Sequence, residues 1–168
     1  MLTSPWLPRV LLAVAIALHA AMMIRLGIVR HQALGSRIFD LGIFDNLVHH
    51  AAEGRWQVTS VLKGGRFTSA HCSPLVQVLG PAYRIWPGPE MLIAFQAVWL
   101  ALGAVPLALL GEHVFRDRPA RAAVGFVFGV AWLCNPSLHG VTLFDFHALA
   151  LAAPMMVWAI YGLHTKRP

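Results

Sequence analysis

Three aspartates stand in similar local sequences, and each could act in acid–base chemistry. Asp40 and Asp45 each follow an Ile-Phe pair, and Asp145 follows Leu143 and Phe144. A carboxylate among large apolar side chains is costly to place unless it has a structural or functional role. Such a group can serve as a general base or as a metal ligand. We therefore take Asp40, Asp45 and Asp145 as candidate catalytic residues.

The structural alternative for these aspartates is helix capping. Asp40 precedes an amphipathic stretch and would make a good N-cap, which does not exclude a second role. At 100° per residue, Asp40 and Asp45 would lie about 140° apart around one helix, so they are not expected to form a paired-carboxylate site. For Asp145 we favour a functional role, because His147 follows it at the start of an apolar segment.

Histidines are numerous, and neutral imidazole is a common metal ligand. The chain has 9 of them, yet no HxxxH, HExxH or HxH spacing. His49 and His50 point two ways on a helix. A divalent-cation site is therefore expected only through tertiary contact, and its candidates are Asp40, His71, Asp145 and His147. The alternative is that these histidines are solvated or lie at an interface.

Lys63 and Arg66 flank two glycines and place two cations on one flexible loop. The segment lacks the GxxxxGK[ST] spacing of a phosphate-binding loop. Lys63 and Arg66 could still bind the phosphate of a lipid. The alternative is a solvated turn.

The composition says which elements must position these residues. The 168-residue chain is 58% hydrophobic and 12% charged, against about 45–50% and about 25% in soluble domains. These values exclude a disordered chain, a disulfide scaffold and a purely soluble enzyme. They predict an all-α polytopic membrane protein in a lipid bilayer. The net charge of +6 would suggest nucleic-acid binding in a soluble protein. In a membrane protein the positive residues instead indicate which loops are cytoplasmic, and no nucleic-acid partner is expected.

Four apolar segments are long enough to cross a bilayer as helices, within one membrane domain, 1–168. The first could instead be a secretory signal, but no small-x-small cleavage site follows it. Asn135-Pro136 is expected to end or kink the third helix, and Pro154 interrupts the fourth. An amphipathic helix over 75–86 is too short to cross and is expected at the interface, with a fifth, kinked span as the alternative. The predicted spans are residues 10–29, 91–110, 122–138 and 146–163.

Basic residues orient these spans. Arg9, the link with Arg116, Arg118 and Arg121, and the C-terminal Lys166 and Arg167 fall on one side, which the positive-inside rule makes cytoplasmic. Both termini are then cytoplasmic. The loop 30–90 and the region around Asp145 are extracytoplasmic and hold five of the seven acids.

Three motifs together resemble a known family. They are residues 39–46 (FDLGIFDN), 71–74 (HCSP) and 143–147 (LFDFH). The chain resembles the N-terminal part of membrane glycosyltransferases of the GT-C fold and, more narrowly, domain of unknown function family 2079. The resemblance implies several spans in a bacterial-type plasma membrane, with the site on the outward face. One departure is that Ala148 and Leu149 follow LFDFH where the family has Pro-Glu.

The resemblance implies glycosyl transfer from a sugar on polyprenyl phosphate, for the cell envelope. Asp40 would be the general base or a metal-linked carboxylate, with Asp45 as the second choice. Basic groups would stabilise the leaving phosphate, and the candidates are Lys63, Arg66, His71 and His147. The family's proteins are longer, so the chain is expected to be a fragment, inactive or completed by a C-terminal half or another subunit. The alternative is a non-catalytic membrane subunit, scaffold or transporter piece.

Overall fold

The computed structural model describes residues 6–69 and 73–165, and this part of the chain is helical. Its β structure is limited to one isolated bridge between Val58 and Arg66. A π-helical turn (Ile38–Gly42) and 3-10 turns at Phe67–Ser69 and Ala148–Leu151 join the helices. The helices are α1 (Trp6–Gln32), α2 (Ile43–Ala52), α3 (Pro74–Gln77), α4 (Gly80–Ile85), α5 (Pro89–Leu102), α6 (Ala104–Val114), α7 (Arg121–Leu133), α8 (Pro136–Leu143) and α9 (Ala152–Thr165).

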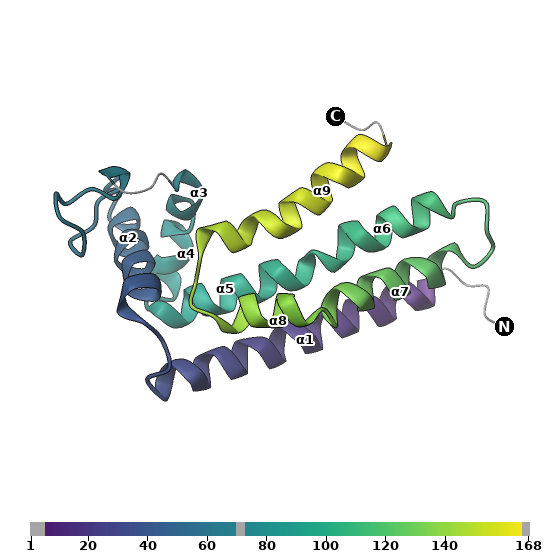
Figure 1. The fold of residues 1–168 in the computed structure, drawn as a ribbon, viewed down its shortest axis with the longest axis horizontal. Coiled ribbons are helices and arrows are strands. Elements are labelled where there is room, and N and C mark those ends of the chain that lie inside the picture. The colour runs from purple at the N-terminus through teal and green to yellow at the C-terminus, as the bar shows by residue number, and fades with distance from the viewer. Residues whose placement is uncertain (1–5, 70–72, 166–168) are drawn as a thin grey trace.

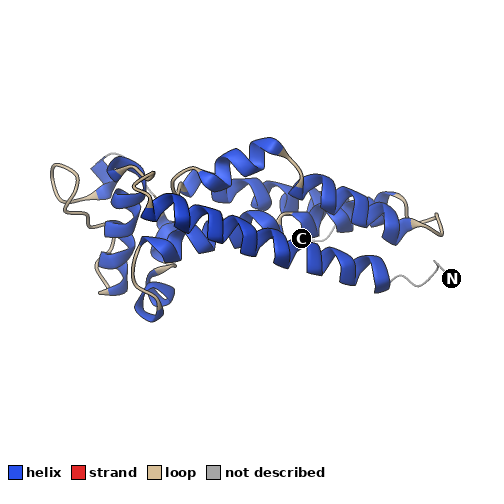
Figure 2. Ribbon diagram, turned by 90° about the horizontal axis from the view of Figure 1, so that it is seen from below, coloured by secondary structure: helices blue, strands red, loops and turns tan. Residues whose placement is uncertain are grey.

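The long helices form an elongated bundle, with the short helices α2, α3 and α4 gathered at one end (Figure 1). Helix α1 packs against α5 and α7, α6 packs against α7, and α9 lies along α6. Figure 2 shows the same arrangement from below, with helix throughout the bundle. Small side chains at the centre let the helices approach closely; they include Ala20, Ala101, Ala104 and Ala108.

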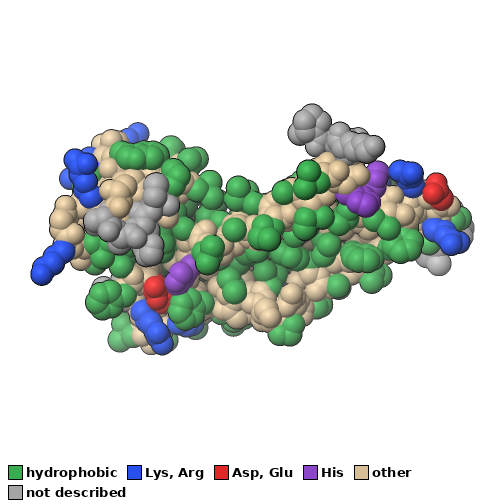
Figure 3. Space-filling model, turned by 45° about the horizontal axis from the view of Figure 1, so that its top comes forward, with side chains coloured by type: hydrophobic (Ala, Val, Ile, Leu, Met, Phe, Trp, Pro, Cys, Tyr) green, Lys and Arg blue, Asp and Glu red, His purple; other side chains and the backbone are tan. Residues whose placement is uncertain are grey.

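Three helices are long and apolar enough to cross a membrane, and a bent pair makes a fourth if it is one span. The three are Trp6–Gln32, Pro89–Val114 and Ala148–Thr165, and the bent pair is α7 with α8. Their outer faces carry exposed large apolar side chains, such as Leu18 on α1 and Met156 on α9. Figure 3 shows charged side chains gathered towards the two ends, with apolar side chains between them. The protein is therefore an all-α polytopic membrane protein, as its composition predicted.

Pro106 explains the break between α5 and α6. Proline has no N–H to donate to Leu102, four residues earlier, and its ring crowds that carbonyl. Gly103 at the break lets the indole of Trp132 pack onto the backbone, because a Cβ there would lie 2.5 Å from Trp132 Cζ2. The indole N–H donates to the carbonyl of Leu100 at 2.8 Å. The break is thus locked by α7.

Pro136 bends the next element. The axes of α7 and α8 differ by 48°. Asn135 caps α8, since its side chain accepts a hydrogen bond from the backbone N–H of Ser137 at 2.9 Å. The kink lies at the Asn135-Pro136 pair that the sequence singled out.

Two elements differ from the sequence prediction, and proline accounts for both. The single interfacial helix expected over 75–86 is two short helices, α3 and α4, because Pro81 starts a new helix at its first turn. The segment expected to be helical from 146 begins with extended backbone at His147 and a 3-10 turn. Pro154 lies in the first turn of α9, where its missing N–H costs nothing, so it starts that helix instead of interrupting it.

An apolar core holds the short helices onto the bundle. Leu47 and Val48 of α2, Phe67 of the loop and Val76 of α3 are buried against Leu92 of α5. Phe146, in the link between α8 and α9, is also fully buried in this core. The link with Asp145 and His147 is therefore fixed beside the π-helical turn that carries Asp40.

Candidate functional site

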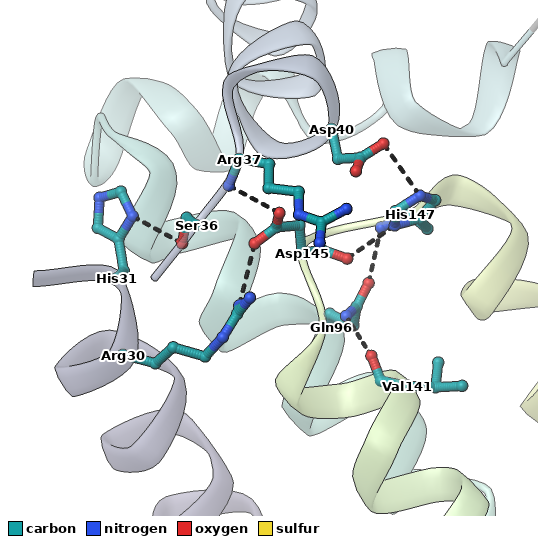
Figure 4. Close-up of polar contacts among 9 residues, drawn as sticks. All are labelled: Arg30, His31, Ser36, Arg37, Asp40, Gln96, Val141, Asp145 and His147. Atoms are coloured by element: carbon teal, nitrogen blue, oxygen red, sulfur yellow. Dashed lines mark hydrogen bonds and ion pairs between the residues drawn. The ribbon is translucent and has the colours of Figure 1, made fainter. Parts of the chain in front are cut away.

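Asp145 is buried in an ion pair that joins distant parts of the chain (Figure 4). Its carboxylate, 2% exposed, accepts a hydrogen bond from Arg30 Nη1 at 3.0 Å and from the backbone N–H of Arg37 at 2.8 Å. Arg30 is in the last turn of α1, so the pair ties this turn to the α8–α9 link. Both carboxylate oxygens are engaged, so Asp145 in this state positions the site and is not a free base.

Gln96 is a buried polar side chain in the middle of α5, and it fixes the same link. Its amide nitrogen donates to the carbonyl of Val141 at 3.1 Å, and its oxygen accepts from the backbone N–H of His147 at 2.9 Å. Val141 is in the last turn of α8, where carbonyls have no donor within the helix. Gln96 therefore satisfies a helix end and holds the backbone of His147 (Figure 4).

Asp40 and His147 form the pair that remains open to the surroundings. His147 Nε2 lies 3.3 Å from Asp40 Oδ1, and the side chains are 36% and 31% exposed. His147 Nδ1 lies 2.8 Å from the backbone carbonyl of Asp145, which can only accept, so Nδ1 carries a proton. Two lone pairs would then repel between Nε2 and the carboxylate unless one proton is shared there. The geometry therefore allows Asp40 Oδ1 and His147 Nε2 to share a proton.

Asp40 does not cap α2, contrary to the capping hypothesis. It lies inside the π-helical turn, and the N-cap position of α2 is Gly42, with no side-chain cap. A carboxylate that reaches His147 cannot also cover the N–H groups of the first turn. The extra residue in the π-helical turn directs Asp40 towards the α8–α9 link instead, as Figure 4 shows.

Two cavities meet at His147. The outer cavity, about 620 Å³, lies between the π-helical turn, α3 and the α8–α9 link, and Asp40, Phe44, Ser73 and Leu149 are among its lining residues. The kink groove, about 750 Å³, lies between the bend at Asn135 and the start of α9. Its lining is mostly apolar and includes Leu100, Trp132, Leu138, Phe144 and Ala153. His147 and Leu149 line both cavities, so the Asp40–His147 pair stands where the outer cavity adjoins the kink groove.

Arg37 is a functional candidate that the sequence reasoning missed. Its backbone binds Asp145, and its exposed guanidinium lies 6.0 Å from the centre of the Phe144 ring. In the view of Figure 4 the Arg37 side chain points towards the region of Asp40 and His147. The available signal was the position of this cation, two residues before the FDLGIFD motif.

Asp45 points away from this site. The phenol of Tyr83 in α4 donates a hydrogen bond to Asp45 at 2.8 Å. Burial raises the pKa of Asp45, and Tyr83 and His49 oppose that rise. Burial and the neighbouring carboxylate raise the pKa of Tyr83. The two groups thus join α2 to α4, and the structure does not bring Asp45 to Asp40, in agreement with the angular argument.

The basic loop also lies apart from the pair. Lys63 and Arg66 are exposed between α2 and α3, and neither is among the described residues that line the two cavities. His71 lies outside the described residues. Both Asp145 oxygens accept hydrogen bonds from N–H donors, so Asp40 and His147 are the remaining potential ligands among the described candidates of the metal site expected from the sequence. Among the residues described, a group of three possible ligands occurs elsewhere, at His49, His50 and Glu53.

Comparison with known proteins places the chain in a family. No curated protein and no solved structure gave a significant match. The family "Predicted membrane protein (DUF2079)" matches residues 30–168, which include Asp40, Arg37, Gln96 and the LFDFH motif. The match covers more than half of the sequence and agrees with the resemblance seen in the motifs. The chain therefore belongs to the family of membrane proteins described as DUF2079.

Proposed function

We propose that this chain takes part in glycosyl transfer from a sugar carried on polyprenyl phosphate, in the manner of GT-C enzymes. The observation that carries the proposal is the Asp40–His147 pair at the border of the outer cavity and the kink groove. A polar donor head group needs an aqueous space with an acid–base residue, and its isoprenoid chain needs an apolar groove beside it. The outer cavity contains Asp40 and His147, and the mostly apolar kink groove adjoins it at His147, which supports the proposal.

Asp40 is the proposed general base. The acceptor hydroxyl attacks the anomeric carbon of the donor, a C–O bond forms there, and the bond from that carbon to the phosphate oxygen breaks. The hydroxyl proton passes to the Asp40 carboxylate, which requires the Asp40–His147 pair to present a free lone pair. The electron pair of the broken bond leaves on polyprenyl phosphate. His147, held at its backbone by Gln96 and at Nδ1 by the carbonyl of Asp145, orients Asp40.

Arg37 is the proposed partner of the leaving phosphate. Its guanidinium is exposed beside the pair and offers several N–H donors to a phosphate. Preorganised positive charge at a developing anion is a large contribution to catalysis. Lys63, Arg66 and His71 remain candidates for contacts with the donor.

The proposal places the Asp40 end of the bundle outside the cytoplasm. The start of α1, the α6–α7 link and the end of α9 lie together at the opposite end of the bundle (Figure 1). That end carries Arg9, Arg116, Arg118 and Arg121, which favours the cytoplasmic side under the positive-inside rule. Product would then be made at the cell envelope. A further membrane segment or subunit beside the exposed face of α9 would supply the acceptor site.

A second candidate is a non-catalytic membrane subunit. It is favoured by the structural use of two of the three candidate aspartates, since Asp145 is buried against Arg30 and Asp45 accepts from Tyr83. On this view the Asp40–His147 pair is a third structural interaction, which holds the π-helical turn to the α8–α9 link. The two candidates differ in what the loss of the Asp40 charge does to glycan products.

The test is the glycan profile of source cells that carry variants of this chain in place of the natural one. Asp40→Asn is expected to abolish the glycan that the natural chain produces, while the protein level in membranes stays unchanged. Asp117→Asn, an exposed carboxylate at the opposite end of the bundle, is the matched control and is expected to leave the profile intact. An unchanged profile with Asp40→Asn would remove Asp40 from catalysis and favour the subunit.

A further inference from the structure

The C-terminal end of α2 gathers three potential metal ligands away from the site described above. His49 Nε2 lies 3.6 Å from Glu53 Oε1, and His50 Nδ1 lies 3.7 Å from Glu53 Oε2. One ligand atom from each residue lies within 4.8 Å of the others. In a tetrahedral site with metal–ligand distances of 2.0–2.2 Å, neighbouring ligands are about 3.4 Å apart. Small side-chain rotations therefore bring these three atoms to coordination distance of one ion.

His50 supplies an independent sign that a ligand is missing from this group. His50 is 8% exposed, and its Nδ1 atom is buried without a hydrogen-bond partner. A buried polar atom in that state is destabilising unless something binds it. Burial, Arg55 and His49 lower the pKa of His50, which favours the neutral imidazole. The neutral ring, with a free lone pair at Nδ1, is the form that coordinates metal ions.

The surroundings of Glu53 favour an ion as well. Arg55 forms an ion pair with Glu53 Oε2 and holds the carboxylate in place, while Oε1 faces His49. Carboxylates that bind metal ions are typically held by a hydrogen bond to a neighbouring residue, as Glu53 is held by Arg55. The three residues also lie at the C-terminal end of a helix, where the backbone carbonyls favour a cation.

We infer that His49, His50 and Glu53 bind one divalent transition-metal ion of the Zn²⁺ class. Two imidazoles and one carboxylate make a three-ligand set that leaves a fourth position open. That position faces solvent, because the side chains of His49 and Glu53 are about half exposed. The ion would fix the last turn of α2 where the loop 53–73 begins. This inference does not depend on the proposed glycosyl transfer, since none of the three residues lines either cavity.

The test is binding of Zn²⁺ and Co²⁺ to the full chain, purified in lipid nanodiscs. Titration of Zn²⁺ against a chromophoric chelator is expected to give one tight equivalent, and Co²⁺ is expected to give the strong visible absorption of a four-coordinate site. Glu53→Gln and His49→Gln, both at exposed positions, are each expected to weaken this equivalent by at least tenfold. His50→Gln is expected to do the same and serves as the variant at the buried position.

A second histidine pair serves as the control. The rings of His113 and His164 lie 5.5 Å apart, outside the proposed metal site. His113→Gln is expected to leave the tight equivalent and the Co²⁺ spectrum unchanged. Circular dichroism of each variant verifies that the helices are intact. Tight binding that survives Glu53→Gln and His49→Gln, or that disappears with His113→Gln, would overturn the assignment. Absence of any tight equivalent in the natural chain would overturn it as well.

Discussion

At the scale of single residues, three aspartates with similar local sequences have three different surroundings. Asp40 faces His147 at the border of two cavities, Asp45 accepts a hydrogen bond from Tyr83, and Asp145 is buried against Arg30. The Phe-Asp pattern therefore identified carboxylates that matter to the fold or the site, but not which role each has. The role is set by partners 38 to 115 residues away, which no local pattern contains.

Asp145→Asn is expected to destabilise the protein strongly. The substitution removes the negative charge opposite Arg30, and breaking a buried ion pair from one side costs about 3–5 kcal/mol. Since Arg30 is only partly buried, the lower end of that range is expected. The measurement is thermal unfolding in nanodiscs, and the double variant Arg30→Gln with Asp145→Asn should recover part of the loss. A melting temperature equal to that of the natural chain would show that the pair does not hold α1 to the link.

Asp45→Asn is expected to keep the Tyr83 hydrogen bond and to remove a pH dependence. Because burial raises the pKa of Asp45 in the folded protein, the folded state binds a proton more tightly than the unfolded state. The stability from Asp45 is then present below its ordinary pKa of about 4 and is lost as pH rises through the folded value. Relative to Asp45→Asn, the natural chain should therefore lose stability from pH 4 upwards.

The measurement for Asp45 is the melting temperature of both proteins at several pH values between 4 and 8. A difference between the two proteins that stays constant across this range would show that the carboxylate is not desolvated by the fold. Asp45→Asn is also expected to leave glycosyl transfer unchanged, because Asp45 lines neither cavity.

At the scale of elements, apolar runs predicted where helices form, and prolines decided where they break. Pro154 was expected to interrupt a helix and Pro81 to lie within one, because the amino-acid pattern does not show where each helix starts. The structure places both in a first helical turn, which is where proline is tolerated. The π-helical turn at Asp40 was not predictable, since it depends on the packing of Leu41 and on His147 across the site.

Gly103→Ala is expected to loosen the contact between the α5–α6 break and α7. A Cβ at position 103 would lie 2.5 Å from the ring of Trp132, so the indole must move and its hydrogen bond to Leu100 weakens. Overpacking of this kind costs about 1–3 kcal/mol. Gly140→Ala in α8 is the control, because a Cβ there meets nothing within 4 Å. Thermal unfolding of both variants is the measurement, and equal melting temperatures would contradict the close packing.

At the scale of the whole molecule, composition and three motifs were enough for the class and the family. The low share of charge predicted a helical membrane protein, and the fold confirms that class. The family match confirms the family that the motifs suggested. The site was only half visible from the sequence: Asp40 and His147 were candidates, but their direct pairing and the roles of Arg30, Arg37 and Gln96 required the fold.

The orientation in the membrane can be tested with single cysteines in a chain with Cys72→Ser and Cys134→Ser. Lys63→Cys, in the loop at the Asp40 end, is expected to react with a membrane-impermeant maleimide in intact cells. Arg118→Cys, in the α6–α7 link at the other end, should react only after the cells are permeabilised, because that link is basic. Labelling of Arg118→Cys in intact cells would reverse the orientation and place the site in the cytoplasm.

The most direct measurement is donor turnover by the purified chain in nanodiscs, with a panel of polyprenyl-phosphate sugars and an acceptor extract from the source membranes. The account predicts release of polyprenyl phosphate by the natural chain and by Asp117→Asn. With Asp40→Asn, turnover should fall by about 10²- to 10⁴-fold, the usual contribution of a general base. Release by the natural chain no faster than in protein-free discs, or an Asp40→Asn rate equal to the natural one, would contradict it.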